Sequence, residues 1–179
     1  MRVKGIDMLY KLFQLIDMIK PAKIAYAHCD IPCGIYDPHL AQLAAHTVIQ
    51  MVNLIEELPK LVPELKPEER REIIHKLARY THVKEEHAEL CKKEVRIIWG
   101  DYFKPEHVQK YPELHELVWK VMKLGSKARQ EINLQASEEL LETVNKIADI
   151  FWETKGMGTV RYKAPYPTGK ETVYPTSKK

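Results

Sequence analysis

The fold of this 179-residue chain is decided by residues 37–59, which read DPHLAQLAAHTVIQMVNLIEELP. Asp37 is a residue type that caps helix N-termini, and Pro38 suits the first position of a helix. Core-forming residues then recur at three- and four-residue spacing, as on one face of an α-helix. They are Leu40, Leu43, Ala44, Thr47, Val48, Met51, Val52 and Ile55. This pattern predicts an amphipathic helix that begins near residue 38 and ends near Pro59.

Later stretches repeat this spacing and predict three more helices. The second is expected at residues 67–99, where a proline and two glutamates form a favourable first turn. The third follows a loop at residues 100–112, and Gly125 is expected to weaken or bend it. The fourth is expected to start at Ser137, a good N-cap, and to end before Gly156.

Four helices without a convincing strand pattern predict an all-α protein, a four-helix bundle over residues 38–155. Cys91 lies at a core position of the second helix and is expected to be a buried small hydrophobe. Residues 156–179 combine Gly, Pro, Tyr and Lys without periodicity. They are expected to form an extended or disordered arm.

The composition excludes several classes of protein. A chain of 179 residues can form one domain with a proper core. The net charge is only +3, and basic residues alternate with acidic ones, so no nucleic-acid-binding stripe emerges. No stretch approaches the roughly 18 apolar residues of a membrane span. Three cysteines in a chain of this size argue against a disulfide-stapled secreted fold and favour a reducing cytoplasm.

Upstream of the first helix, residues 28–38 read HCDIPCGIYDP and concentrate metal ligands in one short loop. His28, Cys29 and Cys33 supply an imidazole and two thiols, while a proline and Gly34 allow the loop to fold back. Thiolates and deprotonated nitrogens favour square-planar nickel. At a free N-terminus, the amine of residue 28 and the amide of residue 29 would complete a plane of two nitrogens and two sulfurs. The fold class is therefore a four-helix bundle preceded by an N-terminal metal-binding hook.

Residues 1–27 are expected to be a leader that is removed without export. Their apolar residues follow helical spacing, but Asp7, Lys11 and Asp17 interrupt the continuous run that a secretory signal needs. Ala25-Tyr26-Ala27 fits a small-x-small cleavage pattern immediately before His28. A leader-processing protease is therefore an expected partner.

The loop resembles the nickel hook of the nickel superoxide dismutases, His-Cys-x-x-Pro-Cys-Gly-x-Tyr-Asp-Pro, and meets every fixed position of that pattern. The resemblance covers roughly residues 28–155. Four further segments are similar to segments of the family, in family order. They are residues 84–90, 99–105, 110–115 and 151–155.

The resemblance implies an enzyme that disproportionates superoxide, with one nickel ion per subunit cycling between Ni(II) and Ni(III). The implied ligands are the amine and imidazole of His28, the amide nitrogen and thiolate of Cys29, and the thiolate of Cys33. Tyr36 and Tyr102 are the implied catalytic residues: Tyr36 helps to control access, and Tyr102 is the second tyrosine near the metal. The family also implies a homohexamer whose neighbouring subunits cover each hook.

A positive charge at Lys104 could attract superoxide. Two positions depart from the family, which often places a glutamate and an arginine around the axial imidazole. Ala44 and His87 stand at these positions. Loss of such supporting residues commonly lowers metal affinity or activity about 10–100-fold.

Two other functions remain open. The first is a nickel- or copper-binding storage or delivery protein without turnover, which the departures at Ala44 and His87 motivate. The second is a thiol-disulfide protein that uses Cys29 and Cys33. Their spacing is longer than the CxxC of thioredoxin-like enzymes, and no βαβ pattern surrounds them.

Overall fold

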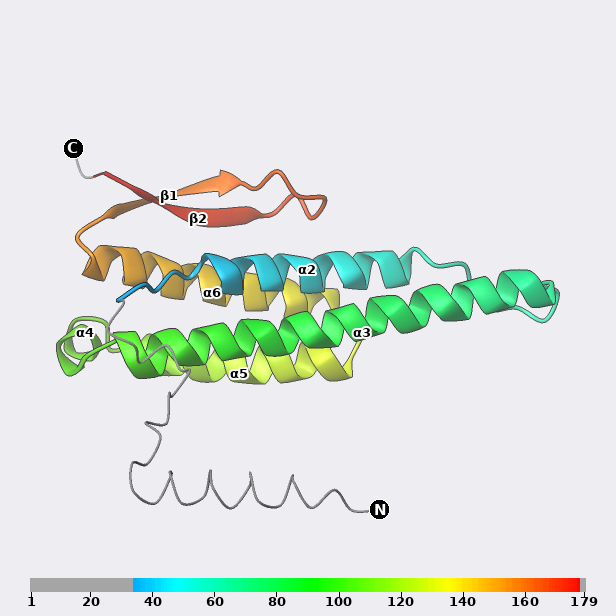
Figure 1. The fold of residues 1–179 in the computed structure, drawn as a ribbon, viewed down its shortest axis with the longest axis horizontal. Helices are drawn as coiled ribbons and strands as arrows, with labels where there is room; N and C mark the ends of the chain where they lie inside the picture. The colour runs from blue at the N-terminus through cyan, green and yellow to red at the C-terminus, as the bar shows by residue number, and fades with distance from the viewer. Residues whose placement is uncertain (1–33, 178–179) are drawn as a thin grey trace, which may run out of the picture. The chain divides into compact units, whose positions relative to one another are not determined.

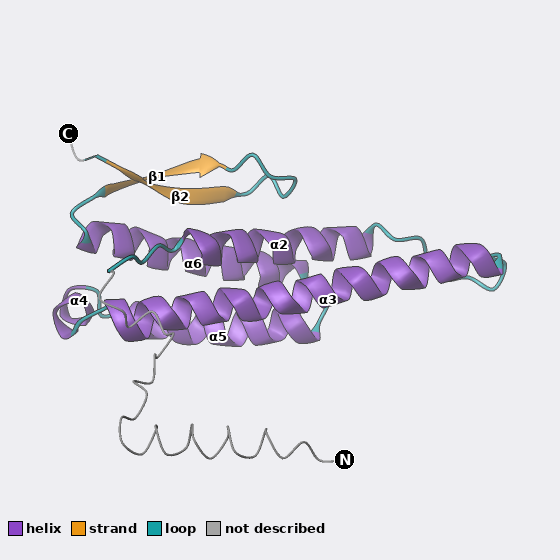
Figure 2. Cartoon of the chain, in the orientation of Figure 1, coloured by secondary structure: helices purple, strands orange, loops and turns teal. Residues whose placement is uncertain are grey.

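The computed structural model describes residues 34–177 of the chain. This part is mostly helical, as predicted, and ends in a β-hairpin (Figures 1 and 2). The elements are α2 (His39–Glu56), α3 (Pro67–Ile97), the π-helix η1 (Ile98–Tyr102), α4 (Pro105–Lys110), α5 (Leu114–Gln130), α6 (Leu134–Thr154), β1 (Gly158–Lys163) and β2 (Glu171–Thr176). None of the described helices is long and apolar enough to cross a membrane.

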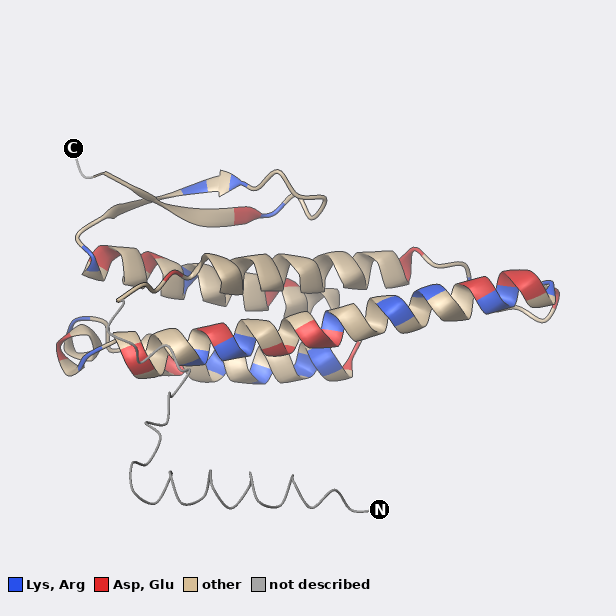
Figure 3. Cartoon of the chain, in the orientation of Figure 1, with Lys and Arg blue, Asp and Glu red and all other residues tan. Residues whose placement is uncertain are grey.

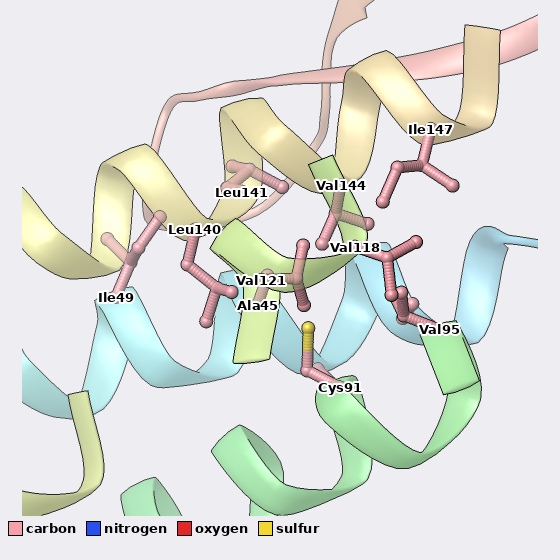
Figure 4. Packing of buried hydrophobic residues seen from close by; sticks show 12 residues of the cluster. Ala45, Ile49, Cys91, Val95, Val118, Val121, Leu140, Leu141, Val144 and Ile147 are labelled. Atoms are coloured by element: carbon pink, nitrogen blue, oxygen red, sulfur yellow. The ribbon is translucent and has the colours of Figure 1, made fainter. Parts of the chain in front are cut away.

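The four long helices of the described region enclose one hydrophobic core. α2 packs against α3 and α6, and α5 packs against the same two helices. All four contribute to a single cluster, most of which Figure 4 shows from close by. Its buried members are Ala41, Ala44, Ala45, Ile49, Cys91, Val95, Val118, Val121, Leu140, Leu141, Val144 and Ile147. Each larger apolar side chain buried here stabilises the fold by about 1.5–3 kcal/mol.

The first helix is buried on two sides rather than along one stripe. It begins at His39, with Pro38 at the N-cap, one residue later than predicted. Asp37 still satisfies the first helical amide, because the His39 amide donates to its carboxylate at 2.7 Å. Its only Asp, Glu, Lys or Arg is Glu56, and the α2 ribbon in Figure 3 is accordingly almost free of charge, unlike α3. Leu40 was expected inside but is 45% exposed.

Gly125 was expected to weaken or bend the third helix, but α5 runs unbroken through this residue. A Cβ at this position would lie only 2.7 Å from Lys92 Cγ and 3.5 Å from the Ala88 carbonyl oxygen on α3. Gly125 therefore lets α5 approach α3 closely.

Two predicted boundaries were wrong. Asn133 rather than Ser137 caps the last helix, because its side chain accepts from the amide of Ala136 at 2.9 Å. The hydroxyl of Ser137 is inside the helix and donates to the Asn133 carbonyl at 2.9 Å. The predicted loop at residues 100–112 contains the end of η1 and the short helix α4.

The C-terminal residues were expected to form an extended or disordered arm without strands, but they form an ordered β-hairpin. β1 and β2 pair antiparallel, from Gly158 opposite Thr176 to Lys163 opposite Glu171. Val173 is buried at 1% exposure. The hairpin lies along α2 and α6 (Figure 1), and this tertiary contact provides the burial that a two-stranded hairpin lacks by itself.

Buried polar side chains of the helices hold the hairpin in place. Gln42 on α2 donates to the Asn145 side chain at 2.8 Å and to the Val173 carbonyl at 3.2 Å. Asn145 on α6 donates to the Glu171 carbonyl at 3.0 Å. The ring of His46 lies between two threonine hydroxyls of the hairpin, at 2.8 and 2.7 Å. We call Gln42, His46 and Asn145 the hairpin seat.

Candidate metal centre and the adjoining tyrosine pair

The three candidate ligands, His28, Cys29 and Cys33, lie outside the described residues. The description starts at Gly34, whose φ of +64° is in the left-handed region that favours glycine. Within residues 34–177, no group of three or more His, Cys, Asp and Glu side chains could hold a metal ion. The donor types of the hook fit nickel, because thiolates and nitrogen donors suit a square-planar divalent ion.

The structure brings Tyr36 and Tyr102 together, although 66 positions separate them in the sequence. Their ring centroids lie 5.6 Å apart with the planes tilted by 51°. In the sequence, Tyr36 follows Cys33, the last candidate ligand, by three positions.

Tyr102 is held in a group of rings that three elements provide. It ends η1, whose wide turn closes through a bond from the Phe103 amide to the Ile98 carbonyl at 3.2 Å. We define the aromatic cluster as Tyr36, Tyr102, Phe103, His107 and Phe151. The His107 ring is stacked on that of Tyr102 at 5.7 Å, and the Phe151 ring lies 4.6 Å away. Such π-turns are frequent at functional sites.

The end of α6 completes this arrangement with two residues to which the sequence had assigned no role. The hydroxyls of Tyr102 and Thr154 are 2.7 Å apart. Lys155 places its ammonium 5.1 Å from the centroid of the Tyr102 ring, within the range of a cation–π contact. The only signal in the sequence was their position in the segment 151–155 that is similar to the family.

Lys104 is exposed and lies two residues after Tyr102. Its backbone amide donates to Nδ1 of His107 at 3.2 Å, at the start of α4. This contact fixes the backbone of Lys104 beside the aromatic cluster and leaves its side chain at the surface.

Ala44 and His87, the two positions that depart from the family pattern, lie in different environments. Ala44 is part of the hydrophobic core, where its methyl group offers no hydrogen bond. His87 on α3 is half-buried, and its Nδ1 donates to the Val83 carbonyl one turn earlier at 2.9 Å. That ring nitrogen is therefore engaged within its own helix.

Cys91 is fully buried in the helical core, as predicted. Figure 4 shows its sulfur pointing into the cluster of apolar side chains. Burial raises the pKa of its thiol to about 12, which keeps it protonated. Its burial among hydrocarbon side chains separates it from metal chemistry.

A helical core that follows a short thiol- and imidazole-rich segment defines a class, the helical metalloproteins. Comparison with known proteins gives the family. The model of a family described as nickel-containing superoxide dismutase matches residues 23–155. The chain therefore belongs to the nickel-containing superoxide dismutase family. The match ends before β1, so the hairpin lies beyond it.

Two curated relatives carry the name superoxide dismutase [Ni]. The protein of Streptomyces coelicolor is 38% identical over 138 residues, which are 77% of this chain and 95% of that protein. The protein of Streptomyces seoulensis is 39% identical over 129 residues, 72% of this chain and 88% of that protein. A solved native structure of a nickel superoxide dismutase is 38% identical, with a TM-score of 0.61. The alignment covers 72% of this chain and 99% of that one.

Proposed function

We propose that this chain removes superoxide at one nickel ion per subunit, bound by the hook residues His28, Cys29 and Cys33. The observation that carries the proposal is the family match, which spans both the hook and the whole helical core. The chain is a superoxide dismutase of the nickel type, and its reaction is 2 O2•− + 2 H+ → O2 + H2O2. The curated relatives are named as enzymes, which favours catalysis over metal storage or delivery.

The residues of the chain have distinct roles in this reaction. Bound nickel supplies the one-electron chemistry, by alternating between Ni(II) and Ni(III). The thiolates of Cys29 and Cys33 and the nitrogens of His28 and Cys29 bind the metal, and their electron-rich character stabilises the higher oxidation state. Tyr36 and Tyr102 narrow the approach and orient small oxygen species. The exposed ammonium of Lys104 attracts the anionic substrate.

The active form in this proposal is the processed chain, a four-helix bundle of residues 38–155 preceded by the hook. A protease removes residues 1–27, and the mature protein assembles as a homohexamer in the cytoplasm. The absence of a secretory signal pattern and the odd number of cysteines support this location. Sedimentation velocity of the nickel-loaded protein tests the assembly, for which we expect the mass of six subunits.

The processing step offers the sharpest test of the function. While Ala27 is attached, the nitrogen of His28 is an amide and cannot act as an amine donor. We expect the chain beginning at His28 to bind one nickel and remove superoxide after Ni(II) is added under reducing conditions. The chain beginning at Met1 should do neither. Comparable activity from the longer chain, with its intact mass verified, would refute the amine ligand. Nickel binding without superoxide removal by the shorter chain would instead support a storage protein.

A further inference from the structure

Thr154 determines which way the hydroxyl of Tyr102 points. The Thr154 hydroxyl donates to the carbonyl oxygen of Phe151 at 2.7 Å, and it also lies 2.7 Å from the Tyr102 hydroxyl. A carbonyl oxygen can only accept a hydrogen bond, and a threonine has one hydroxyl proton. Since that proton is directed at Phe151, the bond between the two hydroxyls is donated by Tyr102.

The direction of this bond limits what Tyr102 can do. Its single hydroxyl proton is committed to Thr154, and its remaining lone pairs can only accept. The hydrogen-bond path from Tyr102 through Thr154 ends at the carbonyl of Phe151. Because this carbonyl has no proton to pass on, the path does not lead protons from solvent to Tyr102.

Both partners are held in place. The Tyr102 ring packs against those of His107 and Phe151, with centroids 5.7 and 4.6 Å away. Thr154 is β-branched, and bonding to a carbonyl one turn earlier is a preferred arrangement of threonine in a helix. Rotation of either hydroxyl would break a bond of 2.7 Å.

We infer that Thr154 is a positioning residue: it takes the hydroxyl proton of Tyr102 and leaves that oxygen able only to accept hydrogen bonds from other species. This inference rests on the proposed function. Tyr102 then binds species that carry a proton, such as water or hydrogen peroxide. It gives no hydrogen bond to a bare anion, so anions that mimic superoxide without reacting are not held at this position. Recognition of the anion is therefore left to other groups.

The direction of the bond is tested first in the metal-free full chain. Tyrosine labelled with 13C at Cζ reports hydrogen bonding of each phenol by NMR, and the Tyr102 resonance is assigned by its loss in Tyr102→Phe. We expect Thr154→Val, which has nearly the same shape but no hydroxyl, to shift this resonance. Thr154→Ser keeps a hydroxyl and should restore the original position.

Thr143→Val is the matched control for this experiment. Thr143 is on the same helix, and its hydroxyl likewise donates to a carbonyl one turn earlier, that of Glu139 at 2.7 Å. This substitution should leave the Tyr102 resonance in place. A resonance that does not move in Thr154→Val, with the fold intact by circular dichroism, would overturn the inference.

The expected effect of Thr154 on anion binding is tested with azide, a small anion that does not react with superoxide. Without Thr154 the Tyr102 hydroxyl is free to donate to the anion, and one hydrogen bond to a charged acceptor strengthens binding by roughly 10-fold or more. We therefore expect azide to inhibit the nickel-loaded Thr154→Val holoenzyme at a roughly 10-fold lower concentration, and Thr154→Ser to behave as the parent. Unchanged azide inhibition in Thr154→Val would show that Thr154 does not control anion binding by Tyr102. If no form of the protein removed superoxide, the proposed function would fail, while the NMR result would still decide the direction of the bond.

Discussion

Lys84 is a charged side chain buried in the helical part of the protein, at 2% exposure. Its ammonium donates to the carbonyls of Ala128, Arg129 and Glu131 where α5 ends, the last two at 3.0 and 2.8 Å. These carbonyls have no partner within their own helix, and the negative end of the helix dipole favours a cation there. Burial lowers the pKa of Lys84, so the hydrogen bonds have to hold the charged form.

Replacement of this lysine should destabilise the protein strongly. Lys84→Met keeps the length and apolar stem of the side chain but removes the donor from three carbonyls. We expect the free energy of unfolding to fall by about 3 kcal/mol, because buried acceptors without a partner are costly. Urea titration followed by circular dichroism measures the change. Lys93→Met, at an exposed position of the same helix, should change it by less than about 0.5 kcal/mol.

The three cysteines should separate into two classes. Cys29→Ser and Cys33→Ser should abolish superoxide removal, because an oxygen donor stabilises the higher nickel state less well than a thiolate. Cys91→Ser should keep nickel and most of the activity, since this thiol is buried and its pKa is raised to about 12. Nickel analysis and a superoxide assay on the three variants check the assignment. Loss of nickel from Cys91→Ser but not from Cys33→Ser would reverse it.

At the scale of elements, the hairpin is joined to α2 through a histidine that burial keeps neutral. Desolvation lowers the pKa of His46 to about 4 from its ordinary 6.5, and the nearby His39 adds a smaller repulsion. Between pH 6.5 and 4, the unfolded chain therefore binds a proton that the folded protein does not. Stability from this group is fully present above pH 6.5 and falls as the pH drops toward 4.

Lowering the pH should therefore lower the free energy of unfolding through protonation of His46. We expect a loss of up to about 3 kcal/mol between pH 6.5 and 4, since one pKa unit corresponds to 1.36 kcal/mol. The free energy of unfolding of His46→Gln should depend less on pH across this window, although the substitution also removes contacts with Thr168 and Thr172. His75→Gln, at an exposed position, should retain the slope of the parent. A parent-like slope in His46→Gln would contradict the assignment.

At the scale of the whole molecule, the hairpin covers a face of the helices that would otherwise meet water. α2 has almost no charged residues. The side-chain nitrogens of Gln42, His46 and Asn145 make hydrogen bonds to the hairpin. Arg161 on β1 adds ion pairs to Glu142 and Asp149 on α6, both at 2.9 Å. The C-terminal residues thus act as part of the domain, although they lie beyond the family match.

Removal of the hairpin should leave a folded but weakened protein. A chain that ends at residue 156 retains the entire segment that matches the family. We expect these residues to keep nearly the helix content of the parent. The free energy of unfolding should fall by about 5 kcal/mol, because the burial of one valine is lost and several polar groups lose their partners. Dye binding to exposed apolar surface should increase. A chain that ends at residue 177 keeps both strands and serves as control. Equal stability of the two chains would show that the hairpin contributes nothing.

The helices could be predicted because their determinants are local. The spacing of apolar residues, the proline at position 67 and the aspartate at position 37 act within one or two turns. The roles of Ser137 and Gly125 were predicted wrongly because they depend on parts of the structure outside their own helical turns. Which of two nearby polar residues caps a helix depends on where the chain turns, and the effect of Gly125 depends on the neighbouring helix, where Lys92 leaves no room for a side chain.

The sequence by itself determined the helical class, the burial of Cys91 and the presence of a hook with nickel-binding residue types, since each follows from residue types at short spacing. Only the tertiary structure placed Tyr36 against Tyr102, directed the Tyr102 hydroxyl to Thr154 and laid the C-terminal hairpin on α2 and α6. These features join residues that are from 52 to 131 positions apart. The free energy of such contacts comes from burial and hydrogen bonding in three dimensions, which no local pattern in the chain encodes.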